Sequence, residues 1–68
     1  MIDYQPFWKT LEQSEENWYT LVHKHGINPS LLHRLKHNMP ISTVTIDMFC
    51  KLLGCNVNDI LRFIEEDN

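Results

Sequence analysis

The chain has 68 residues and a formal net charge of −3. This length allows one small domain and leaves no room for an enzyme core beside a separate substrate-binding domain. Hydrophobic residues make up 43% and charged residues 22% of the chain, a composition that excludes wholesale disorder. The negative total, before its distribution is considered, argues against a polyanionic partner such as nucleic acid.

The two cysteines, Cys50 and Cys55, indicate a reducing compartment, because a small oxidised domain usually carries more cysteines at framework spacings. The chain does not open with basic residues followed by an apolar run, so we expect no signal peptide. Its apolar runs are far shorter than the roughly 20 residues that a membrane span needs. We therefore expect a soluble cytoplasmic domain that carries no cofactor.

Helical periodicity describes the chain better than strand alternation, which is weak throughout. A first helix is expected over about residues 4–13, because Phe7, Trp8 and Leu11 recur there at helical spacing. Pro6 is compatible with the first turn of such a helix. This helix is expected to turn its aromatic and leucine side chains toward the core.

Asn17 is a suitable N-cap for a second helix over about residues 18–25, and Gly26 is a suitable residue to end it. Asn28 and the proline that follows it form a new start signal, for a third helix over about residues 29–36. The residues of this region expected to face inward are Leu21, Val22, Ile27, Leu32 and Leu35.

Ser42 or Thr43 is expected to cap a fourth helix that runs to Leu53 and ends at Gly54. Asn56 is expected to cap a short fifth helix. The inward residues of these two helices are expected to be Ile46, Phe49, Cys50, Leu53, Ile60 and Leu61, with Phe63 and Ile64 as further candidates.

The second and third helices are joined by a three-residue interval, from Gly26 to Asn28. So short an interval does not allow an antiparallel hairpin of long helices. It is typical of the helix-turn-helix, in which two helices cross at about 90–120° through a tight turn. In that arrangement the second helix enters the DNA major groove by its N-terminal half.

Residues 17–28, NWYTLVHKHGIN, resemble the start of a Cro/lambda-repressor-like (XRE-type) helix-turn-helix. Residues 46–61, IDMFCKLLGCNVNDIL, are similar to the fourth and fifth helices of that family. The stretch FCKLLGC resembles in particular a branch of short stand-alone regulators from Gram-positive bacteria and their mobile elements. The resemblance as a whole covers about residues 4–64.

The resemblance implies an all-α fold, a compact five-helix lambda-repressor-like DNA-binding domain over residues 1–68. The central helix-turn-helix would span about residues 17–37, and the acidic tail at about residues 65–68 would fray. It further implies sequence-specific binding of double-stranded DNA, with a recognition helix over about residues 28–36.

The solvent face of the third helix is expected to read the bases. Arg34 can pair with a guanine edge in bidentate fashion, and Asn28 and Ser30 can bond to bases or phosphate. Leu31 either touches a thymine methyl group or packs on a neighbouring helix. Including phosphate contacts from the second helix and from the segment after the third, the expected DNA-binding residues are Asn17, Trp18, Asn28, Pro29, Ser30, Leu31, His33, Arg34, His37, Asn38 and Thr43.

The charges are unevenly distributed along the chain. Residues 17–46 contain no Asp or Glu, and they hold Lys24, Arg34, Lys36 and all four histidines. The segments before and after this window are both acidic. Because a carboxylate there would repel the DNA backbone, an acid-free window on the two groove-facing helices suits phosphate binding.

Some residues allow a second interpretation. Trp18 and Tyr19 either close the core over the first helix or lie against the sugar-phosphate backbone of DNA. His33 and His37 are spaced to bind a metal ion from one helix face, but no cysteine or carboxylate lies near them in sequence, so we predict no metal site. Protonation of the histidines would tighten phosphate binding at lower pH. Cys50 and Cys55 are interpreted as core residues, with a redox switch as the alternative.

The chain contains no catalytic motif, so we predict that it is not an enzyme. We expect a small transcriptional regulator that binds palindromic DNA as a homodimer, through exposed apolar residues near Phe63 and Ile64 or through the first helix. No membrane or small-molecule partner is expected. The alternative is a protein-interaction module, antitoxin-like or anti-repressor. It is favoured by the few basic residues and by Trp18, where the family usually has Gln.

Overall fold

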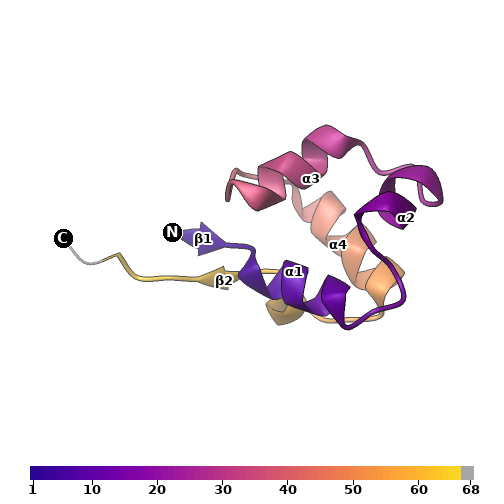
Figure 1. Ribbon diagram of the computed structural model, residues 1–68. Coiled ribbons are helices and arrows are strands. Elements are labelled where there is room, and N and C mark those ends of the chain that lie inside the picture. Colours follow the sequence, from indigo (N-terminus) through magenta and orange to yellow (C-terminus); the bar gives the residue numbers. More distant parts are fainter. Residues whose placement is uncertain (67–68) are drawn as a thin grey trace.

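Four α-helices form the body of the protein, and a small two-stranded sheet joins the beginning of the chain to its later part (Figure 1). The computed structural model describes residues 1–66. Within them the elements follow in the order β1 (Ile2–Asp3), α1 (Gln5–Glu12), α2 (Trp18–His23), α3 (Pro29–Lys36), α4 (Thr43–Leu53), the 3-10 helix η1 (Val57–Asp59) and β2 (Arg62–Phe63).

The helices begin where their capping residues predict. The Oδ1 atom of Asn17 accepts a hydrogen bond from the Thr20 N–H at 2.9 Å, and the Asn28 Oδ1 accepts one from the Ser30 N–H at 2.9 Å. At α4 the Ser42 hydroxyl accepts from the Thr45 N–H at 3.2 Å, so Ser42 is the N-cap. These bonds satisfy main-chain donors that the first helical turn leaves unpaired.

The ends of the helices also follow local sequence signals, except that α2 ends earlier than predicted. Gly54 ends α4 with a φ of 63°, a left-handed conformation that favours glycine. Helix α2 ends at His23, before the predicted boundary near residue 25. The Lys24 and His25 N–H groups both bond to the Thr20 carbonyl, at 2.9 and 3.1 Å, which tightens the chain into the turn before Gly26.

The core is a single cluster at the centre of the helices. Phe7 of α1 and Phe49 of α4 are fully buried and meet edge to face, with ring centroids 4.9 Å apart. The sequence did not indicate that Tyr4 is also buried, with its hydroxyl donating to the Met39 carbonyl at 2.8 Å. The buried residues are Tyr4, Phe7, Leu11, Leu21, Ile27, Leu32, Leu35, Phe49 and Ile60.

The predicted fifth helix is wrong. Within residues 1–66 the only helical turn after α4 is the 3-10 turn η1, because two bonds from α1 hold Asp59 at its end and Ile60 directly after it. The Thr10 hydroxyl donates to the Asp59 carbonyl at 2.8 Å, and the Phe7 N–H donates to the Ile60 carbonyl at 3.1 Å. Continued helix would take both carbonyls into its own ladder. The structure is therefore a four-helix domain within residues 1–66.

Beyond η1 the chain is extended and pairs with its own beginning. In the antiparallel sheet Ile2 lies opposite Phe63 and Asp3 opposite Arg62, whose Nε is 2.8 Å from the Asp3 carboxylate. Phe63 is 71% exposed and Ile64 is 37% exposed. The prediction that these two residues face the core is therefore wrong. Of the tail predicted to fray, Glu65 and Glu66 are exposed and residues 67–68 lie outside the described part.

Candidate nucleic-acid interface

The turn between α2 and α3 is pinned to the core. Ile27, in the middle of the turn, is buried, and its N–H bonds to the Leu21 carbonyl at 2.9 Å. Leu32 and Leu35 bury one side of α3. Helix α3 lies on the outside of the helical body in Figure 1 and follows α2. A rigid helix thus presents one face to solvent.

That face of α3 is polar and cationic. Ser30, His33, Arg34 and Lys36 are exposed, as is His37 at the helix end. Within residues 1–66, neither Arg34 nor Lys36 forms an ion pair with a carboxylate. A guanidinium, an ammonium and imidazoles on one solvent face are able to donate to base edges and phosphate oxygens.

The two capping asparagines lie at the rim of this face. Asn17 and Asn28 are exposed, and each uses its Oδ1 to cap a helix. Their Nδ2 amide groups are still able to donate hydrogen bonds. The capped helices hold these amides in position. Pro29, the first residue of α3, is exposed as well and has no N–H to offer. The side-chain oxygens of Asn17 and Asn28 therefore stabilise the helix starts, and only their Nδ2 amides are available for contact with DNA.

Trp18 is half-buried and lies between helices. Its ring stacks on Trp8 of α1, with centroids 5.9 Å apart and planes at 11°, and meets the edge of His33 at 5.3 Å. Trp8, Trp18, Gln5 and Lys36 surround a hollow of about 330 Å³. The indole thus packs α2 against both α1 and α3, which favours the interpretation that Trp18 closes the core over the first helix over contact with the DNA backbone.

Three other candidates have contacts within the fold. Leu31 is half-buried against the core, which favours the packing alternative over contact with a thymine methyl group. Asn38, with a φ of 56°, accepts the Tyr4 N–H at 3.1 Å and so ties the end of α3 to the start of α1. Thr43 is exposed in the first turn of α4.

Glu16 was missed as a residue of this region. Its carboxylate lies 3.1 Å from His25 Nε2 and 3.9 Å from Lys24 Nζ. Hydrogen bonds from Thr20 and His25, with a smaller contribution from the Lys24 charge, hold the pKa of this carboxyl below its ordinary value. Glu16 therefore pairs with part of the positive charge near the turn. The signal in the sequence was its position as the last acid before the acid-free window.

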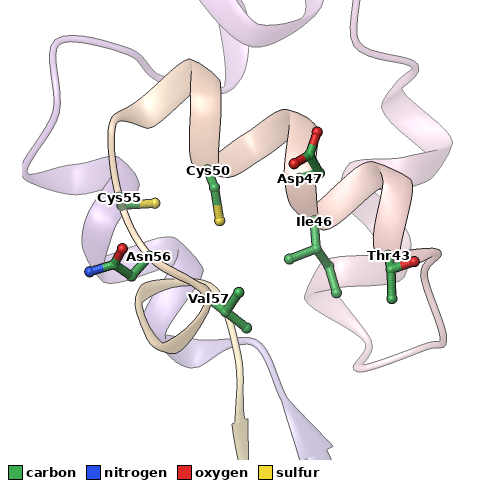
Figure 2. Close-up of a pocket in the computed structure, with 7 residues that line it drawn as sticks. All are labelled: Thr43, Ile46, Asp47, Cys50, Cys55, Asn56 and Val57. Carbon is green, nitrogen blue, oxygen red and sulfur yellow. The ribbon is translucent and has the colours of Figure 1, made fainter.

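The cysteines lie apart from α3, beside a hollow of about 410 Å³ between α4 and η1 (Figure 2). Both are free and half-buried, and both pack against the core. Their sulfur atoms point into the hollow. Burial, the neighbouring Cys50 thiol and Asp59 raise the pKa of Cys55 to about 11. Cys55 is therefore a protonated thiol near neutral pH, of low nucleophilicity.

No helix within residues 1–66 is long and apolar enough to cross a membrane. Nor do three or more His, Cys, Asp or Glu side chains in this part of the chain gather as a metal site. His33 and His37 remain exposed positions of the α3 face.

An α2–turn–α3 unit with a buried turn and an exposed cationic second helix defines a helix-turn-helix protein. The model of the Cro/C1-type HTH DNA-binding domain matches residues 6–66, and the chain belongs to that family. This confirms the family resemblance carried by residues 17–28 and 46–61.

Among solved structures, the crystal structure of the transcriptional regulator VanUg, Form II, is similar to this chain with a TM-score of 0.81. The sequences are 25% identical, and the match covers 96% of this chain and 87% of that one. No curated protein matches the chain closely enough to count as a relative. A regulator of transcription thus has the same fold over nearly the whole chain.

Proposed function

We propose that this protein is a small transcriptional regulator that binds specific sites in duplex DNA, with α3 in the major groove. The observation that carries the proposal is the exposed face of α3, where Arg34 and Lys36 form no ion pair with a carboxylate of residues 1–66 and belong to a segment without acidic residues. The family match and the similar regulator structure support the same function.

The residues on and beside this face of α3 are suited to two kinds of contact with DNA. Arg34 and Ser30, on the exposed side of α3, are suited to base edges, and Arg34 favours guanine. Asn17 at the start of α2, His37 at the end of α3 and Lys36 are suited to phosphates. Phosphate contacts fix the orientation of the helix, and base contacts select the sequence.

A homodimer on a palindromic site completes the proposal. One module with so short a recognition helix contacts few base pairs, and two-fold related modules double the specific contacts. Each copy would place its α3 in a successive major groove on one side of the duplex.

Selection of bound sequences from a random duplex pool, followed by mobility shifts with the selected site, tests this function. Arg34→Ala is expected to cost about 1–3 kcal/mol and to relax selection at one base pair of each half-site. Lys36→Ala is expected to weaken all sites alike and to lower the salt dependence by about one unit of slope per copy.

Lys51→Ala is the matched control, because Lys51 is exposed on α4 and paired with Asp47 at 3.0 Å. It is expected to leave DNA affinity unchanged. Absence of any duplex binding at low salt, with circular dichroism showing the helices intact, would reject the regulator in favour of a protein-interaction module.

A further inference from the structure

Cys50 and Cys55 are brought together by the way in which α4 ends. Gly54 stops the helix in a left-handed conformation, and the Cys55 N–H turns back to bond to the Cys50 carbonyl at 3.0 Å. This is the closing bond of a Schellman-type helix end. In such an end the residue after the glycine commonly contacts the residue four positions before the glycine. The two cysteines occupy these two positions.

The main-chain bond limits the separation of the two cysteines. With an N···O distance of 3.0 Å, standard bond lengths place their Cα atoms at most about 7 Å apart. Any bend at the hydrogen-bonded atoms shortens this separation further. Disulfides bridge Cα atoms that lie roughly 4.4–6.8 Å apart. A bridge between Cys50 and Cys55 is therefore compatible with the backbone at the end of α4.

The two thiols are directed at the same space. In Figure 2 both sulfur atoms point into the hollow of about 410 Å³ between α4 and η1, and both thiols are free. Burial raises the pKa of Cys55, with smaller contributions from the charges of Cys50 and Asp59 and from a hydrogen bond with the Cys50 thiol. The thiols are therefore neighbours. A role in core packing alone does not account for sulfur atoms that point into a hollow.

The hollow admits a small reagent and disfavours an anionic one. Exposed residues, Asp47 and Val57 among them, line it beside the sulfur atoms. The Asp47 carboxylate is paired with Lys51 at 3.0 Å, and the Asp59 charge acts on Cys55. Two carboxylates against one ammonium make the surroundings of the thiols negative. A neutral or cationic reagent therefore approaches the sulfur atoms more readily than an anionic one.

We propose that Cys50 and Cys55 form a site of thiol–disulfide exchange, which takes small uncharged or cationic disulfides and closes to an intramolecular disulfide. The site lies on α4 and in the turn that follows it, apart from α3. Exchange at this site therefore goes beyond the proposed binding of DNA and does not depend on it.

The exchange begins at Cys50, because the raised pKa leaves Cys55 protonated near neutral pH. The Cys50 thiolate, its proton lost to water, attacks one sulfur of the small disulfide, forms a mixed disulfide and expels a small thiolate. Cys50 then carries no charge that opposes ionisation of Cys55. The Cys55 thiolate attacks the Cys50 sulfur and expels the second small thiolate. The protein loses two electrons and two protons, and the reagent takes them up as two small thiols.

Incubation of the reduced, folded chain with an excess of bis(hydroxyethyl) disulfide, which is uncharged, tests the site. Remaining thiols are then alkylated in acid-quenched samples, and the chain is weighed by mass spectrometry. The native chain is expected to lose two hydrogen atoms and to carry neither an alkyl group nor a hydroxyethyl group. Thiols that stay reduced, a mixed disulfide that persists, or a covalent dimer of two chains would each overturn the proposal.

Cys50→Ala and Cys55→Ala are the matched variants, with circular dichroism to check their helices. Each retains one thiol and is expected to end as a stable mixed disulfide with the reagent. Cys55→Ala is expected to react faster than Cys50→Ala, because it retains the thiol that attacks first. A native chain that expels the bound hydroxyethyl group no more readily than Cys55→Ala also overturns the proposal. This comparison shows whether Cys55 resolves the mixed disulfide.

The contribution of the fold is measured by the exchange equilibrium in redox buffers, with and without concentrated urea. The folded chain is expected to favour the disulfide at least about tenfold more than the unfolded chain, because the end of α4 already holds the cysteines together. By the same linkage, the oxidised chain is expected to melt at a higher temperature than the reduced chain. An equal or weaker preference for the disulfide in the folded chain contradicts the proposal.

Asp47→Asn tests the class of reagent. Rate constants are measured at low salt with cystamine, which is cationic, and with glutathione disulfide, which is anionic. The ratio of the cystamine rate to the glutathione disulfide rate is expected to fall at least about twofold in the variant, because one carboxylate beside the thiols is removed. Comparing ratios cancels the intrinsic reactivities of the two reagents. An unchanged ratio would overturn the assignment to uncharged and cationic disulfides.

Discussion

Glu16 controls how much positive charge is available around the helix-turn-helix. It lies next to the N-cap of α2 in sequence, and its carboxylate faces Lys24 and His25 at the end of that helix. Arg34 and Lys36 on α3 have no such partner within residues 1–66. The free cationic groups near the helix-turn-helix are thereby concentrated on α3, and those beside the turn are paired with Glu16.

Glu16→Gln is expected to lower the melting temperature at pH 7. The pKa of Glu16 is depressed in the folded protein, so the ionised carboxyl stabilises the fold above its unfolded pKa. This stabilisation is lost as pH falls through the folded pKa. Thermal unfolding followed by circular dichroism should show a difference at pH 7 that shrinks and then disappears as the pH falls through the folded pKa of Glu16, which lies below the ordinary carboxyl value. Glu15→Gln, an exposed neighbour, is the control. A loss caused by Glu16→Gln that does not change as the pH is lowered would contradict the ionic explanation.

Two glycines and one asparagine set where the helices turn. Gly26, Asn38 and Gly54 have φ values of 69°, 56° and 63° and stand after α2, α3 and α4. A Cβ added at either glycine would meet no atom within 4 Å, so space does not require glycine there. The requirement is the left-handed backbone, which glycine adopts without strain and asparagine at modest cost.

Gly26→Ala and Gly54→Ala are each expected to destabilise the protein by about 1 kcal/mol, because the cost is in the backbone conformation. Asparagine at either position should cost less than alanine, as Asn38 already adopts this conformation. Urea unfolding with a common m-value measures both differences. Equal stability of the alanine and native chains would show that the turns relax to another conformation.

The whole molecule is elongated, with extents of 42 × 22 × 21 Å, because the strands extend from a small helical body. One core cluster holds that body together, and Phe49 is its link between α4 and α1. The charged residues are also divided between the helical body and the strands. The acid-free segment makes α2 and α3, and the acidic segments include β1 and β2, which Figure 1 places away from the α2–α3 turn. The net charge of −3 therefore does not oppose DNA binding by the α3 face.

Phe49→Ala is expected to cost about 3–5 kcal/mol, because it opens a cavity in a fully buried cluster. Small domains have free energies of unfolding of roughly 5 kcal/mol, so most molecules of this variant should be unfolded at 37 °C. Helical circular dichroism in a urea titration checks this. Val44→Ala, on the exposed side of the same helix, should stay within about 0.5 kcal/mol of the native chain. A cooperative, nearly native transition for Phe49→Ala would mean that the core repacks.

The sequence by itself determined the starts of the helices, the turns at Gly26 and Gly54, most of the core and the helix-turn-helix family. These features depend on signals within a few residues of each other, such as the bond from the Thr20 N–H to Asn17. The position of α3 as an exposed, cationic helix followed from the same local periodicity. The individual DNA contacts of its residues stay predictions.

The tertiary structure decided the end of the fold and the roles of several candidate site residues. β2 forms because residues 62 and 63 meet residues 2 and 3, and η1 stays short because α1 takes the Asp59 and Ile60 carbonyls. Trp18 packs between helices for the same kind of reason. Contacts between residues so distant in sequence leave no local periodicity, so only the folded arrangement turned an expected helix into a strand with an open edge.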